Sequence, residues 1–135
     1  MRLKIYSALA IIIIGLSYFS FAEDTQQEGL QDNNPKMALE LLQNQGAVVL
    51  DVRSQGEWNA GHVSSAHLIP IQELQTKIDK VDELVQGDKS KAIIVYCQSG
   101  RRAGMAKSIL LKAGYKNVMN LGGLSDWPNK KDITR

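Results

Sequence analysis

From residue 34 onward, short apolar runs alternate with segments of helical periodicity. Asn34-Pro35 precedes a leucine-rich segment that Gly46 ends, and a capping residue, a first-turn proline and a terminal glycine together predict a helix between them. The apolar run at 47–52 and the run at 91–96 are expected as strands. The second is the clearer prediction because it is β-branched and uninterrupted, as a strand buried on both faces should be.

The remainder of the chain continues this alternation. Residues 66–70 and 115–121 are expected as further strands, whereas 71–85 and 103–113 have the apolar spacing of amphipathic helices, the first as one helix or two short ones. The stretches expected to connect these elements are 53–62, as a loop or short helix, 97–102 as a loop, and Gly122-Gly123 as a turn. Strands that alternate with helices predict an α/β fold with a central parallel sheet and helices on both faces.

The first 22 residues have the pattern of a secretory signal. Arg2 and Lys4 precede an uncharged, largely apolar stretch, and the small residues Ser20 and Ala22 fit a cleavage before Glu23. We therefore expect a signal peptide at 1–22 and export to the periplasm. The alternative is an uncleaved anchor formed by residues 5–22, whose length is close to the lower limit of about 17 residues for a membrane-spanning helix. Either way, the folded part is expected outside the cytoplasm.

Length and charge fit one neutral domain after the signal. The 135 residues suffice for a single core, which we place at 34–135, after a polar, acidic linker at 23–33. The signal contains two of the 16 basic residues, so 14 basic residues balance 14 acidic ones in the remainder. This balance argues against a nucleic-acid or anionic-membrane partner after signal cleavage. The two separated histidines and the lone cysteine predict neither a metal site nor a disulfide.

The candidate chemistry lies at Cys97, which directly follows the clearest strand. A buried parallel strand delivers Cys97 to the carboxyl edge of the sheet, where ligands bind in open α/β folds, and a helix begins a few residues later. Gly100 allows a tight turn that points backbone N–H groups inward, and Arg101 and Arg102 add positive charge. These features favour a reactive thiolate. The alternative is that Cys97 is a small buried apolar residue, as many lone cysteines are.

Two kinds of chemistry use a cysteine in such an anion cradle. Phosphatases of the Cys-x5-Arg type have arginine six positions after the cysteine, where this chain has Ala103. The ring from Cys97 to Arg102 is smaller, and it suits a persulfide and the sulfonate of thiosulfate better than a phosphoryl group.

These motifs resemble those of the rhodanese family over residues 34–128. The Cys-x-x-Gly-x-Arg loop is matched by Cys97, Gly100 and Arg102, and further blocks occur in the family's order. The matching blocks are Asp51-Val-Arg53, Glu57-Trp58, Gly61-His62-Val63, Ala66, Ile69-Pro70, Gly114-Tyr115, Val118, Leu121-Gly122-Gly123 and Trp127. With its short length and its signal, the chain is most similar to single-domain periplasmic rhodaneses of the phage-shock type. It departs from the family pattern at Ser65, His67 and Gln98, where Gly, Asn and Arg are more usual.

The resemblance implies a thiosulfate sulfurtransferase that needs no cofactor. Cys97 would be the catalytic nucleophile and form a persulfide, from which cyanide or a thiol takes the sulfur. The residues that would bind the substrate are Gln98, Ser99, Gly100, Arg101 and Arg102. We expect a monomer whose partners are a small sulfur donor and a thiophilic acceptor. The alternatives are a persulfide carrier or redox-sensing module with little turnover and, less favoured, a cysteine-based phosphatase or arsenate reductase.

Other polar residues are expected to support the site rather than react. Asp51 and Arg53 follow a strand that ends at the same edge as Cys97, and they could shape the site. An ion pair of Arg53 with Asp51 or Glu57 is the favoured role. His62 and His67 are expected to be structural, because attack by an existing thiolate needs no general base. Trp58 and Trp127 are expected to be packing residues.

Overall fold

The computed structural model describes residues 30–135, so the predicted signal peptide and most of the predicted linker lie outside the described residues. None of the helices within 30–135 is long and apolar enough to cross a bilayer. The elements are α1 (Pro35–Gln45), β1 (Val48–Asp51), α2 (Gln55–Ala60), β2 (His62–Val63), β3 (Ala66–Leu68), α3 (Ile71–Leu74), α4 (Ile78–Leu84), β4 (Ile93–Cys97), α5 (Arg101–Lys112), β5 (Val118–Gly123), the 3-10 turns η3 (Leu124–Asp126) and η4 (Lys130–Asp132), and β6 (Ile133–Thr134).

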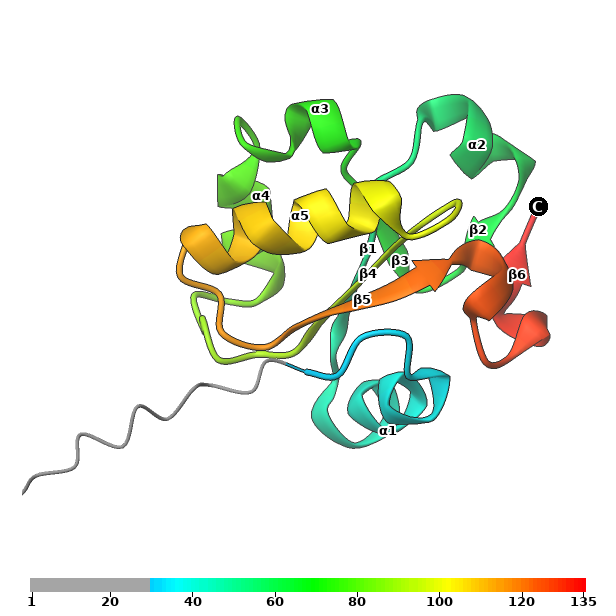
Figure 1. Cartoon of the computed structure of the whole chain (residues 1–135), viewed down its shortest axis with the longest axis horizontal. Coiled ribbons are helices and arrows are strands. Elements are labelled where there is room, and N and C mark those ends of the chain that lie inside the picture. Colours follow the sequence, from blue (N-terminus) through cyan, green and yellow to red (C-terminus); the bar gives the residue numbers. More distant parts are fainter. Residues whose placement is uncertain (1–29) are drawn as a thin grey trace, which may run out of the picture.

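A four-stranded sheet in the order β3-β1-β4-β5 forms the centre of the fold, and every neighbouring pair is parallel. Helix α1 lies on one face, whereas α3, α4 and α5 lie on the other (Figure 1). The predicted α/β architecture, with helices on both faces, is therefore confirmed. All four strands end at the edge beside α2 and the β4–α5 loop, so residues that follow the strands gather there (Figure 1).

Local signals in the sequence set the bounds of α1. The Asn34 side chain accepts a hydrogen bond from the Met37 N–H at 3.0 Å, and Pro35 occupies the first helical turn, where its missing N–H costs nothing. At the other end, Gly46 has φ +60, the left-handed conformation that glycine adopts most readily. The predicted cap, proline and terminal glycine all have their expected places.

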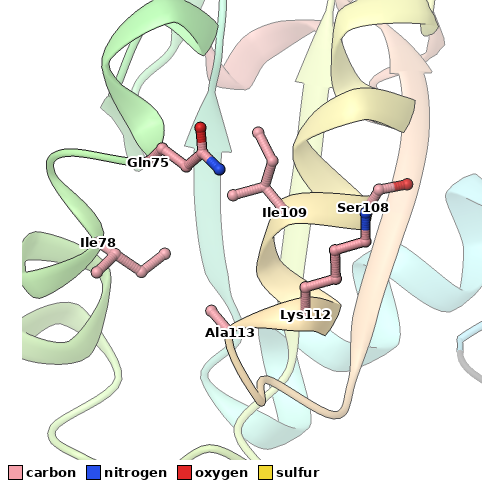
Figure 2. Close-up of a pocket in the computed structure, with 6 residues that line it drawn as sticks. All are labelled: Gln75, Ile78, Ser108, Ile109, Lys112 and Ala113. Carbon is pink, nitrogen blue, oxygen red and sulfur yellow. The ribbon is translucent and has the colours of Figure 1, made fainter.

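The helices on the α5 face leave a cavity of about 310 Å³ between them. Figure 2 shows Gln75 and Ile78 on one side and Ile109 and Lys112 of α5 on the other. This cavity lies beside the C-terminal half of α5, and Cys97 precedes the N-terminal end of that helix. The cavity is therefore separate from the predicted chemistry.

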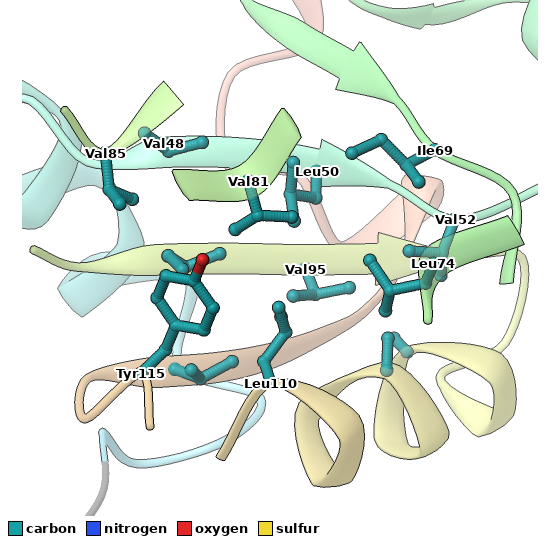
Figure 3. Close-up of a cluster of buried hydrophobic side chains, with 14 of the residues drawn as sticks. Val48, Leu50, Val52, Ile69, Leu74, Val81, Val85, Val95, Leu110 and Tyr115 are labelled. Atoms are coloured by element: carbon teal, nitrogen blue, oxygen red, sulfur yellow. The ribbon is translucent and has the colours of Figure 1, made fainter. Parts of the chain in front are cut away.

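Alternate residues of β4 supply the two halves of the core. Ile93, Val95 and Cys97 face the cluster under α5, which Figure 3 shows with Leu110 packed against the sheet. Ile94 and Tyr96 face the cluster beneath α1. All five residues of the strand are buried, which explains its uninterrupted apolar sequence. Each fully buried aliphatic side chain contributes about 1.5–3 kcal/mol of transfer free energy.

The structure corrects the start of one predicted helix and the end of one predicted strand. Helix α5 begins at Arg101, not at Ala103, so both arginines belong to its first turn. Strand β5 continues through Gly122-Gly123, which were expected to form a turn. Residues 71–85 form two short helices, one of the two forms expected. A small antiparallel sheet of β2 with β6 was not predicted, because two-residue strands have no recognisable periodicity.

Candidate active site

Cys97 is the last residue of β4 and lies at the carboxyl edge of the sheet. Its side chain is only 1% exposed, and its Sγ accepts a hydrogen bond from the Gly100 N–H at 3.0 Å. The loop therefore folds back over the sulfur instead of pointing into solvent. The burial alone fits a structural cysteine, but the N–H aimed at the sulfur is the contact that an anion cradle provides.

The turn at Gly100 holds this loop against the neighbouring strand. Gly100 has φ +96, a conformation that side chains disfavour, and a Cβ there would lie 3.3 Å from the Gly122 Cα. The Asn120 side chain of β5 donates to the Gly100 carbonyl at 3.0 Å. A Cβ at Gly123 would overlap the Gln98 carbonyl oxygen. Glycine at positions 100 and 123 is thus required for the close approach of β5 to the Cys97 loop.

Helix α5 presents its N-terminus to the same loop. Gly100 is its capping residue, and no side chain within the described residues caps it. The first N–H groups of a helix have no partner within the helix, so this end favours an anion. The other predicted loop residues lie around it: Gln98 and Ser99 are exposed in the loop, and Arg101 is exposed on the first helical turn.

Arg102 forms a two-pronged ion pair with Glu57. Its Nη1 lies 2.7 Å from Glu57 Oε1 and its Nη2 lies 2.9 Å from Oε2. This hydrogen bonding raises the pKa of Arg102, and the nearby Cys97 adds to the effect. The pair engages two of the five guanidinium N–H groups and leaves three for another anion.

Glu57 is fixed by its own short helix before it contacts Arg102. Ser54 and Glu57 form a reciprocal capping box at the start of α2. Hydrogen bonding from Arg102, with further bonds from Ser54, lowers the pKa of Glu57 from 4.5 to about 2. The sequence pattern Ser-x-x-Glu gives a signal for the cap. The pairing with Arg102, 45 residues away, has no local signal and was not predicted.

Arg53 pairs with Asp51, one of the two partners predicted for it. Its Nη2 lies 2.7 Å from Asp51 Oδ2 and also donates to the Gly61 carbonyl at 2.7 Å. Burial by itself lowers the pKa of Arg53, but the hydrogen bonds and charge of Asp51 outweigh it and leave the pKa raised. This buried pair ties the end of β1 to the end of α2, beside the site.

The contacts of His62, Trp58 and Trp127 are stacking and hydrogen bonds within the fold. The His62 ring stacks on Trp58 with centroids 3.5 Å apart, and its Nδ1 lies 2.9 Å from the Trp58 carbonyl oxygen. His67 is exposed on β3. Trp127 is 2% exposed, and its Nε1 donates to Asp132 at 3.1 Å. Neither histidine forms a hydrogen bond with Cys97.

The departures from the family pattern cause no backbone strain. The described residues other than glycine that have positive φ are Asn33 and Gln86. Ser65, where the family usually has glycine, is not among them, so the turn after β2 does not need a glycine.

Comparisons with known proteins agree with this geometry. A family model described as "Rhodanese-like domain" matches residues 34–130. The chain is 39% identical over 77 residues to thiosulfate sulfurtransferase PspE of Escherichia coli K12, covering 57% of this chain and 70% of that protein. It is 30% identical over 92 residues to the tRNA uridine(34) hydroxylase of Photorhabdus laumondii, covering 67% of this chain but only 26% of that protein.

Solved structures show the same fold. A rhodanese from E. coli, determined with anions, has a TM-score of 0.58 and 34% identity, covering 66% of this chain and 98% of its own. The human single-domain sulfurtransferase TSTD1 has a TM-score of 0.57 and 25% identity, covering 71% of this chain and 92% of its own. With a family match over most of the described residues, this chain belongs to the rhodanese-like domain family, whose members similar to it include sulfurtransferases and hydroxylases.

Proposed function

We propose that this chain is a sulfurtransferase that moves sulfane sulfur from thiosulfate, through a persulfide on Cys97, to cyanide or a thiol. The observation that carries the proposal is the 3.0 Å hydrogen bond from the Gly100 N–H to Cys97 Sγ, in a loop that also faces the uncapped end of α5. A backbone donor aimed at sulfur stabilises negative charge there without reorganising during the reaction. We assign Cys97 as the catalytic residue.

In the first half-reaction, the Cys97 thiolate attacks the outer sulfur of thiosulfate. A bond forms between Cys97 Sγ and that sulfur, the sulfur–sulfur bond of thiosulfate breaks, and its electron pair leaves with sulfite. The loop from Gln98 to Arg102 binds the donor in this proposal. The three remaining N–H groups of Arg102 suit the sulfonate oxygens, because guanidinium binds such groups through paired hydrogen bonds.

In the second half-reaction, an acceptor attacks the outer sulfur of the persulfide. With cyanide, a carbon–sulfur bond forms, the sulfur–sulfur bond breaks, and Cys97 regains its electron pair while thiocyanate leaves. No proton must be removed in either step if Cys97 reacts as a thiolate. This explains why a site without a histidine at the sulfur supports the chemistry.

The burial of Cys97 favours a small donor. A cysteine that is 1% exposed admits a narrow group such as the terminal sulfur of thiosulfate more readily than a bulky one. The phosphatase alternative has less support, because position 103 is a buried alanine on the first turn of α5 and offers no guanidinium to a phosphoryl group. The tRNA hydroxylase relatives extend far beyond the matched region, so their activity is not proposed for this chain.

We also propose that the working form is a monomer exported to the periplasm by residues 1–22 and released from them, with the linker at 23–33 followed by the domain at 34–135. The support is the charged, apolar and small-residue pattern of the first 22 residues. Mass spectrometry of the protein isolated from the periplasm checks this proposal. A mature chain beginning at Glu23 is the expected result, and a full-length chain found in the membrane would contradict it.

The sulfurtransferase proposal is tested by thiocyanate formation from thiosulfate and cyanide. The wild-type protein should turn over with ping-pong kinetics, and Cys97→Ser should abolish transfer while leaving the fold intact by circular dichroism. Hydrolysis of p-nitrophenyl phosphate by the same preparation serves as the matched control. Sulfur transfer that survives in Cys97→Ser would refute the assignment of the nucleophile.

A further inference from the structure

A groove of about 390 Å³ lies beside the Cys97 loop. Residues from the ends of three segments meet in it. Gln98 directly follows Cys97, Gly61 ends α2, and Leu124 follows Gly123, the register partner of Cys97 in β5. The groove therefore lies at the carboxyl edge of the sheet, beside the loop that begins at Cys97.

The walls of this groove combine apolar surface with positive charge. Leu124 and Ile133 supply apolar area, and Lys130 and Arg135 supply two cationic side chains. No acidic side chain lines it, and the structure describes every lining residue. By contrast, the hollow beside β3 has both Lys80 and Glu83 in its lining. The charge of the groove thus suits a ligand that is anionic at one end.

Lys130 is held in place before any ligand arrives. Its Nζ donates to the Ser125 carbonyl and, at 3.2 Å, to the Trp127 carbonyl. These bonds use two of its three N–H groups and fix the charge on the wall, although the residue is exposed. A cation fixed in this way loses less conformational entropy when it binds an anion.

We propose that this groove is the acceptor subsite, and that it selects small thiols with a carboxylate group. This inference rests on the proposed function. The carboxylate binds at Lys130 and Arg135, and the thiolate reaches across Gln98 to the persulfide. The thiolate attacks the outer sulfur, a new sulfur–sulfur bond forms on the acceptor, the Cys97–sulfur bond breaks, and its electron pair returns to Cys97. Any proton on the outer sulfur leaves with the product persulfide.

The test separates the two half-reactions in the purified full chain. Thiosulfate first loads Cys97, followed by intact mass. Mercaptopropionate, which has a carboxylate, or the neutral mercaptoethanol then unloads it. Lys130→Glu should lower kcat/KM for mercaptopropionate by about tenfold, the loss expected for a hydrogen bond to a charged group. It should leave kcat/KM for mercaptoethanol and the loading rate unchanged. Added salt should shrink the difference.

Matched variants make the outcome decisive. Lys36→Glu introduces the same change of charge on an exposed residue of α1 and should leave the preference for mercaptopropionate unchanged. Lys130→Gln and Arg135→Gln, which disturb the fold less, should each lower the preference by a smaller factor. If these variants load normally but keep the wild-type preference, or if loading slows as much as unloading, the acceptor subsite is refuted. If the wild-type protein does not load at all, the proposed function fails instead.

Discussion

Two arginine–carboxylate pairs lie at the same edge of the sheet, and they differ in burial and in what surrounds them. The Asp51–Arg53 pair is almost fully enclosed, with side chains 0% and 3% exposed. The Glu57–Arg102 pair is about 30% exposed on both partners, and Arg102 lies in the first turn of α5, which follows the Cys97 loop. Both pairs use the same functional groups at the same 2.7 Å closest approach. Their surroundings therefore determine what each contributes.

Under the proposed function, the same kind of contact serves the fold in the first pair and the chemistry in the second. Asp51 and Arg53 pair with each other in the interior, and Arg53 also donates a hydrogen bond to the Gly61 carbonyl. Removal of either partner therefore leaves the other as an unpaired buried charge. Arg102 keeps access to solvent and has N–H groups to spare. Its loss should affect the bound anion more than the stability of the fold.

The largest expected effect is on stability, from Arg53→Ala. It leaves the Asp51 carboxylate buried without its partner, which costs about 3–5 kcal/mol in comparable cases. Urea denaturation followed by circular dichroism measures the loss. Arg53→Lys is the matched control, because it keeps the charge but not the planar fork, and it should recover only part of the stability. A change below about 1 kcal/mol in Arg53→Ala, the range of surface pairs, would contradict the difference between the two pairs.

The second prediction concerns Arg102→Ala, which we expect to change the KM for thiosulfate more than the stability of the fold. Because the pair with Glu57 is partly exposed, we expect the free energy of unfolding to fall by only about 1 kcal/mol or less. The KM for thiosulfate should rise by about tenfold, as expected when one hydrogen-bonded charge is lost. Steady-state kinetics at varied thiosulfate, alongside urea denaturation, check both values. An Arg102→Ala protein with normal KM and a large stability loss would make this pair structural like the other.

The smallest expected effect is on the pH dependence of the free energy of unfolding, which Glu57→Gln should weaken. The folded-state pKa of Glu57 is about 2, below its ordinary 4.5, so its contribution to stability is complete above pH 4.5 and is lost as the pH falls towards 2. Solvent screening keeps the contribution small. Stability measured across this window should fall less steeply in Glu57→Gln than in the wild type. Parallel curves for the two proteins would show that Arg102 does not hold the Glu57 charge.

The sequence predicted most of the fold because the local signals agree with one another. Asn34, Pro35 and Gly46 set the limits of α1, and the uninterrupted apolar run of β4 placed Cys97 at the edge of the sheet. The start of α5 was misplaced because its capping residue is Gly100, which has no side chain to give a capping signal.

The candidate site was only partly predictable, because only some of its contacts join residues that are close in the sequence. The loop around Cys97 is contiguous in the sequence, so its residues could be named from their spacing. The Glu57–Arg102 pair joins segments 45 residues apart, and the β2–β6 pairing joins His62 to Thr134. Such contacts depend on how the whole chain packs. The functions of Gln98, Ser99 and Arg101 stay predictions, because their exposure alone assigns them no ligand.

The most direct test of the central claim is the intact mass of the protein after treatment with thiosulfate. The account predicts a gain of one sulfur atom, located on Cys97 by peptide mapping, that cyanide removes with an equal yield of thiocyanate. Cys97→Ser should gain nothing under the same conditions. An unchanged wild-type mass with no thiocyanate formed would contradict sulfur transfer through Cys97.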